Sequence, residues 1–421
     1  MIFKNKTPWL WAVGLLLLFP LFFQLRGGVY RDINPVIDSQ GVLATLPLPV
    51  SLVACMTLFV FLTSRSVKRI FPALVMIGGV ILVSLISLWL GSDGVVPPQR
   101  KLLMIAQVML PLAGLMLGQL VDDRDKIIAQ AFLVVVSIVV PLQLLASWLQ
   151  GGLILTHYLY AFSIYSHFQY VTLIFVCAFA FSLTSLWEEH RVWLCIMIIP
   201  MLAYATASLS FLTIFAYLCV MVVLASLKLY KYRAKVTAKS AAIFLILAVA
   251  AGAGALAYFR EMSGTNFLLE KHQRTFHGKF KSLAEGKIPT NVQERLDDWK
   301  FFGSAIFESK KTVLVGHPQP MPREIKSSPH NWYIDMGYTF GLVGIFPVLM
   351  LVAYTAGLCW KHRRTLPAET WWLAALVFYM VIVDSNFKVT LRQPYPGIFA
   401  YFMWGLLLSR LRIPLVSRQG T

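Results

Sequence analysis

The sequence predicts an all-α membrane protein that crosses the bilayer many times. Hydrophobic residues make up 58% of the 421 residues, and charged residues only 13%. Many apolar runs reach the roughly 17–25 residues that a helix needs to cross a bilayer. Short clusters of basic residues separate these runs, as the positive-inside rule requires. The net charge of +18 therefore indicates membrane topology, and we expect no nucleic-acid partner.

About twelve candidate transmembrane helices follow from the apolar runs. The first run follows a basic start but precedes no small-residue cleavage site, which predicts a retained helix rather than a removed signal peptide. In chain order the runs lie near 9–26, 48–64, 70–91, 102–120, 127–149, 169–187, 192–207, 210–227, 241–258, 335–358, 371–386 and 395–410.

The basic residues predict the topology and three parts of the chain. Roughly half of them lie in one set of short connections, which places both termini in the cytoplasm. The opposite short loops carry only Arg26, Arg31, Arg100, Lys101, Lys388 and Arg392. We expect transmembrane helices one to nine in residues 1–258, a large outer loop forming a mostly helical cap in 259–334, and helices ten to twelve in 335–421.

The outer loop contains an amphipathic stretch from Asn291 to Phe307. Its apolar residues recur at helical spacing, which predicts a helix with one buried face. These residues are Leu296, Trp299, Phe302 and Ile306. The five cysteines fall in or at the ends of apolar runs without metal-ligand spacing, so we expect neither a disulfide nor a zinc site.

The segment from Ser327 to Gly337 combines polar groups at the point where this loop meets an apolar run. Ser328 and Pro329 form a helix-start signal, with serine as N-cap and proline at the first helical position. We therefore expect His330 and Asn331 in the first turn, beside free N–H groups that favour phosphate binding. The positive helix end should lower the histidine pKa, so that the neutral ring can act as a general base. A histidine that merely caps the loop at the membrane interface is the open alternative.

His330-Asn331, then nine residues, then Gly341, two residues and Gly344 resembles the signature of bacterial O-antigen ligases. These form a superfamily with O-antigen polymerases and some bacterial protein oligosaccharyltransferases. The helix number and the late outer loop also resemble the ligases over the whole chain, which implies a fold like that of class C glycosyltransferases. A second family element is similar to the pattern of Arg295, three intervening residues and Trp299 in the outer loop. A solvated arginine on an amphipathic helix remains the alternative.

A third family element departs from the pattern. The family often has a Ser-Arg-Gly-like turn before the eighth helix, whereas this chain has Ser208, Leu209 and Ser210. The arginine is therefore missing at Leu209. Outer-side cations are the candidates to replace it: Arg100, Lys101, Lys388 and Arg392.

The resemblance implies a reaction on the periplasmic side of the inner membrane, in lipopolysaccharide assembly. A glycan passes from undecaprenyl-diphosphate-linked O-antigen to a sugar hydroxyl of lipid A–core oligosaccharide, with inversion at the anomeric carbon and membrane lipids around the site. His330 is the candidate base, and Arg295, Asn331 and the four outer cations are candidates for binding the donor diphosphate. Because a diphosphate leaves as a stable anion, we expect cationic side chains to suffice, with no metal and no cofactor.

Two other functions remain open. An O-antigen polymerase would use two lipid-linked glycans, and its active site tends to carry extra outer arginines, of which this chain has few. A transporter or flippase would need polar residues deep in its helices, whereas these runs are almost purely apolar. The exception is Asp384, an intramembrane carboxylate that Lys388, four residues on, is spaced to neutralise.

Overall fold

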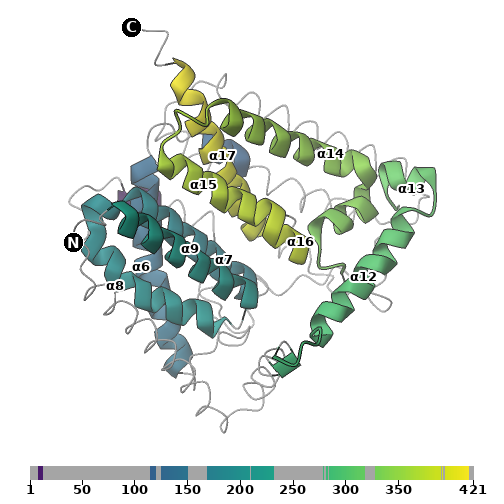
Figure 1. Cartoon of the computed structure of the whole chain (residues 1–421), viewed down its shortest axis with the longest axis horizontal. Coiled ribbons are helices and arrows are strands. Elements are labelled where there is room, and N and C mark those ends of the chain that lie inside the picture. Colours follow the sequence, from purple (N-terminus) through teal and green to yellow (C-terminus); the bar gives the residue numbers. More distant parts are fainter. Residues whose placement is uncertain are drawn as a thin grey trace. The chain divides into compact units, whose positions relative to one another are not determined.

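The protein is all-α over the residues that the structure describes, as the sequence predicts (Figure 1). The computed structural model describes residues 8–12, 114–119, 125–149, 168–208, 210–231, 278, 281–282, 284–317, 328–389, 391 and 394–416. The chain divides into two compact units. One comprises Met1–Pro20, Val29–Ala131 and Asn291–Thr421, and the other comprises Leu21–Gly28 and Phe132–Thr290.

Four of the described helices are long and apolar enough to cross a membrane, by length and composition: Lys126–Leu149, Trp187–Ala207, Trp332–Lys361 and Ala368–Phe387. Two shorter apolar helices cover Val171–Ser185 and Leu212–Leu224. All six coincide with predicted apolar runs. The runs 48–64, 70–91 and 241–258, and most of 9–26 and 102–120, lie outside the described residues. The number of about twelve spans and the periplasmic cap therefore stay predictions.

Packed aromatic side chains hold together the helices of the second unit. The rings of Phe175 and Tyr204 meet edge to face at 5.6 Å, and the indole of Trp193 donates a hydrogen bond of 2.8 Å to Ser137 Oγ. α7 contacts both α8 and α9 (Figure 1). The helices are α6 (Asp125–Leu149, in this unit from Phe132 on), α7 (Phe168–Ser185), α8 (Trp187–Ala207) and α9 (Phe211–Lys231).

The first unit contains the remaining described helices. They are α12 (Thr290–Ile306), α13 (Lys310–Val315), α14 (Trp332–Lys361), α15 (Ala368–Phe378), the π-helix η2 (Tyr379–Asp384), α16 (Ser385–Phe387) and α17 (Pro394–Val416). The segments α15, η2 and α16 follow one another without a break and form one continuous rod. α17 packs against α15 and joins α14 through a 2.8 Å hydrogen bond from Trp404 Nε1 to Thr355 Oγ1.

A break at Gly341 divides α14 into two segments, and the helix changes direction there (Figure 1). Gly341 has φ 66° and ψ −169°, a conformation that L side chains rarely adopt. The backbone of α13 fills the space beside it, because a Cβ added to Gly341 would lie 2.3 Å from the carbonyl oxygen of Leu314. A Cβ on Gly344 would lie 2.5 Å from Cβ of Phe340. Both glycines of the histidine motif therefore have a steric role.

The substitution Gly341→Ala is expected to destabilise the protein by about 2–5 kcal/mol, because it combines an unfavourable backbone conformation with overpacking. Gly357→Ala is the matched control in the same helix, since a Cβ at Gly357 meets nothing within 4 Å. That substitution should be neutral or stabilise by up to about 1 kcal/mol. Thermal unfolding in detergent measures both, and equal midpoints for the two variants would contradict the steric account.

Candidate functional site

The C-terminal end of α12 packs against the first segment of α14, and the amphipathic sequence of α12 explains this contact. Phe302, Ala305 and Tyr338 form a buried apolar cluster, against which Ile306 and Ile334 pack. The rings of Phe302 and Tyr338 meet edge to face at 5.3 Å. The predicted amphipathic helix over 291–307 is thus confirmed as α12. The N-terminal part of α12, which carries Arg295 and Trp299, contacts two further segments of the chain.

Arg295 and Trp299 connect α12 to the loop before α14 and to the end of α16. Arg295 Nη1 donates a hydrogen bond of 3.0 Å to the carbonyl oxygen of Phe387, the last residue of α16. Trp299 Nε1 donates a hydrogen bond of 2.8 Å to the carbonyl oxygen of Pro329. The rings of Trp299 and Phe387 lie 6.3 Å apart. The predicted pair of α12 residues therefore lies at a junction of three segments, next to His330.

The predicted start of α14 is wrong. The helix begins at Trp332 with Asn331 as its N-cap, so His330 and Asn331 precede the first turn. The Oδ1 atom of Asn331 accepts hydrogen bonds from the N–H groups of Tyr333 at 2.9 Å and Ile334 at 3.1 Å. Asparagine caps helices about as well as serine, so the sequence offers two possible N-caps three residues apart, Ser328 and Asn331. These two N–H groups are bonded within the protein, so they do not form the phosphate site expected from the sequence.

His330 has a left-handed backbone with φ 50°, and no other described non-glycine residue has a positive φ. Its N–H donates to Ser328 Oγ at 3.2 Å. On one side of His330, the Pro329 carbonyl accepts the hydrogen bond from Trp299. On the other side, Asn331 is fixed as the N-cap of α14. A left-handed non-glycine residue costs of order 1–3 kcal/mol and persists only where its surroundings fix it, which is common at functional sites. The local structure therefore sets the direction of the imidazole.

The pKa of His330 is lowered from its ordinary value, in the direction that the sequence predicts. The main cause is burial of the ring, and the positive charge of Arg295 lowers the pKa further. The carboxylate of Asp298 acts in the opposite sense and raises it. A neutral imidazole next to a guanidinium is suited to accept a proton close to an anion.

Asn386 is a residue of the site that the sequence analysis missed. Its Oδ1 accepts a hydrogen bond of 3.2 Å from Nδ2 of the buried Asn331, and its own Nδ2 donates to the carbonyl of Ile382 at 2.7 Å. Tyr333 OH donates to the carbonyl of Val381 at 2.9 Å. The end of the α15–η2–α16 rod therefore supports the His330–Asn331 loop as well as Arg295. The amide of Asn331 is used for this support, which favours orientation of the loop over phosphate binding.

Lys388 forms an ion pair with Asp384 at 3.4 Å, as their spacing predicts. Both residues are buried, with exposed fractions of 5% for Lys388 and 0% for Asp384. The side chain of Lys388 is thus engaged with a carboxylate inside the rod, and it is not an exposed cation. Asp384 is the last residue of η2 and Lys388 follows directly after α16, so the ion pair spans the segment that carries Asn386 and the Phe387 carbonyl.

Replacing Lys388 by methionine is expected to destabilise the protein by about 3–5 kcal/mol, because the carboxylate of Asp384 would remain buried without its partner. The double variant Asp384→Asn with Lys388→Met should recover most of that loss, since both charges are then removed. Thermal unfolding of the two variants and of Asp384→Asn measures the coupling. Additive losses would contradict a buried ion pair.

The structure does not describe the other predicted site residues. Arg100, Lys101, Leu209 and Arg392 lie outside the described residues. Ser208 and Ser210 form hydrogen bonds within the turn between α8 and α9, where Ser210 N donates to Ser208 Oγ at 3.3 Å. In the described part of the chain, no group of three or more His, Cys, Asp or Glu side chains is arranged to hold a metal ion.

No protein-family model matches the sequence, and no match was found among curated proteins. The chemistry that the site can perform is therefore inferred from its residues alone. A half-buried histidine with a lowered pKa, an arginine and a rigid loop meet at the end of apolar helices. Such a site is suited to deprotonate a hydroxyl group near a bound anion.

Proposed function

We propose that the protein is an O-antigen ligase, an integral-membrane glycosyltransferase that joins a lipid-linked glycan to lipid A–core. The observation that carries the proposal is the pairing of His330 with Arg295. The histidine has a lowered pKa and a fixed left-handed backbone, and the arginine lies close enough to contribute to that pKa. A transfer from a diphosphate needs a group that accepts the hydroxyl proton and a cation that stabilises the leaving group, and His330 and Arg295 are suited to these two roles.

The helix lengths support a location of this site at the membrane surface. The second segment of α14, from Leu342 to Lys361, and the rod Ala368–Phe387 each contain about 20 residues, or about 30 Å, which matches the hydrocarbon core of a bilayer. A short turn joins their ends. The break at Gly341 and the end of the rod at Phe387 then lie at the same membrane face, and the His330 loop packs against that end.

The turn between these two helices supports the orientation. It carries Arg363 and Arg364, and basic residues mark cytoplasmic connections. The guanidinium of Arg363 lies 4.5 Å from the centre of the exposed Trp360 ring, a pair typical of a membrane–water interface. The proposed active site therefore faces the opposite side, which is the periplasm in a bacterial inner membrane.

In the proposed reaction, an acceptor hydroxyl of lipid A–core attacks the anomeric carbon of the donor glycan. The bond from that carbon to the diphosphate oxygen breaks while the new glycosidic bond forms, so the configuration inverts. His330 takes the hydroxyl proton, and Arg295 stabilises the negative charge on the departing undecaprenyl diphosphate. Asn331 and Asn386 hold the loop that aims the imidazole.

The experiment is transfer by the purified chain in nanodiscs, with lipid-linked glycan and lipid A–core, with and without a chelator of divalent metals. A ligase forms a product that contains both glycan and lipid A–core. Lengthened lipid-linked glycan formed without lipid A–core would instead indicate a polymerase. Passage of the lipid-linked glycan across a vesicle bilayer, with no new glycosidic bond, would indicate a transporter. Loss of product only in the reactions that contain the chelator would contradict a metal-independent reaction.

A further inference from the structure

The corner between α12 and α13, residues Phe307–Leu314, exposes large apolar side chains beside basic ones. Phe307 is 76% exposed and Leu314 is 54% exposed. Lys310 and Lys311 are exposed between them, and Glu308 is the one acidic residue of this corner. The corner thus carries apolar side chains together with an excess of positive charge. This combination is typical of segments that lie in the headgroup region of a membrane.

The exposed side chains of the corner project from a rigid structure. Ser309 caps α13, where its Oγ accepts from Thr312 N at 3.0 Å and its own N–H donates to Thr312 Oγ1 at 3.0 Å. Thr312 Oγ1 also donates to the carbonyl of Ile306 at 2.9 Å, which ties α13 to the end of α12. These hydrogen bonds define the geometry of the corner from which Phe307 and Leu314 project.

The corner is continuous with an exposed apolar stripe on α14. The backbone of Leu314 lies against Gly341, so α13 lies beside α14 at the break (Figure 1). Leu342 and Phe346 are exposed one helical turn apart, and the stripe continues through Leu349 and Met350. An apolar stripe on a helix long enough to cross a membrane faces lipid, and Leu314 extends that surface to the level of the break.

We propose that the α12–α13 corner inserts into the bilayer surface and binds anionic phospholipid. Phe307 and Leu314 enter the outer part of the hydrocarbon layer, and Lys310 and Lys311 contact lipid phosphates. The corner then holds α12 along the membrane plane, at the height of the helix break. This proposal rests on the exposed residues and the length of α14, and it does not depend on the proposed reaction.

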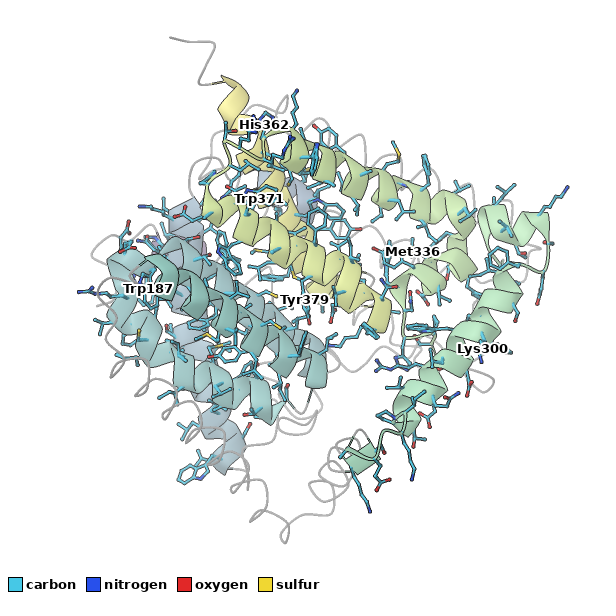
Figure 2. All side chains as sticks on the ribbon, in the orientation of Figure 1. Trp187, Lys300, Met336, His362, Trp371 and Tyr379 are labelled. Carbon is cyan, nitrogen blue, oxygen red and sulfur yellow. The ribbon has the colours of Figure 1, made fainter. Side chains whose placement is uncertain are left out.

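Spin labels test the depth of the corner. The full chain, with its five cysteines replaced by serine, is labelled at Phe307→Cys or Leu314→Cys in nanodiscs that contain phosphatidylglycerol. Lys300→Cys is the control, because Lys300 lies on the exposed face of α12 (Figure 2). Collisions with oxygen should exceed collisions with a water-soluble nickel chelate at the two corner positions, and the order should reverse at the control. Greater access of the chelate at the corner, or burial from both reagents under another protein surface, would overturn the proposal.

Lipid charge is tested in the protein with its own cysteines. Phosphatidylglycerol added to the detergent-solubilised chain should raise the unfolding midpoint more than phosphatidylcholine does. The double variant Lys310→Glu with Lys311→Glu should lose most of that difference, whereas Lys300→Glu should keep it. An unchanged difference in the double variant would contradict binding of anionic lipid at the corner.

Discussion

Replacing His330 by asparagine is expected to lower the rate of glycan transfer by about 10²- to 10⁴-fold, the usual contribution of a general base. Asparagine tolerates a positive φ, so the backbone at 50° can be kept. Its amide does not accept a proton near neutral pH. The loss should therefore appear in kcat, with little change in KM for the donor, because the substitution removes an interaction made in the transition state.

The matched control is His330→Gly, which removes the ring and also relieves the backbone strain. Its unfolding midpoint should equal or exceed that of the wild type, while its transfer rate should fall as far as that of the asparagine variant. Together the two variants separate the chemistry of the ring from its effect on the fold. Transfer within a few-fold of wild type in both stable variants would exclude His330 as the base.

Replacing Arg295 by alanine is expected to lower the transfer rate by about 10²- to 10³-fold, a loss comparable to that of one preorganised group facing developing negative charge. The guanidinium also lowers the pKa of His330. Its removal should raise that pKa, so the histidine becomes protonated at a higher pH. The acid side of the pH–rate profile should therefore move to higher pH in the remaining activity.

Asp298→Asn is the control of opposite sign. The carboxylate of Asp298 raises the pKa of His330, so its removal should lower that pKa. The acid side of the profile should then move to lower pH, while Arg295 is still present to bind the donor. A pH–rate profile for the wild type and both variants measures these shifts. Shifts in the same direction, or none, would contradict titration of His330 as the origin of the profile.

The apolar runs coincide with the membrane-length helices that the structure describes, but the start of α14 differs from the prediction. Residues 291–307 have a clear apolar face, and α12 packs through that face against Tyr338. At the start of α14, Ser328 and Asn331 are both good caps, and only tertiary contacts chose between them. Trp299 holds the Pro329 carbonyl and Asn386 holds Asn331, which leaves the helix to begin at Trp332.

The support of the site could not be read from local sequence. Arg295 reaches the carbonyl of Phe387 across 92 residues of chain, and a backbone carbonyl carries no sequence signature. The left-handed conformation of His330 depends on contacts to both sides of it. Asn386, by contrast, had a signal, because it is a polar residue between Asp384 and Lys388 at the end of an apolar run.

A structure of the full chain in nanodiscs with undecaprenyl-diphosphate-linked glycan tests the central claim most directly. We expect the diphosphate oxygens within about 2.7–2.9 Å of the Arg295 guanidinium nitrogens, as in charge-assisted hydrogen bonds. The anomeric carbon should face the His330 ring, with space between them for an acceptor hydroxyl. A diphosphate bound away from Arg295, with the His330 ring turned from the donor, would contradict the account.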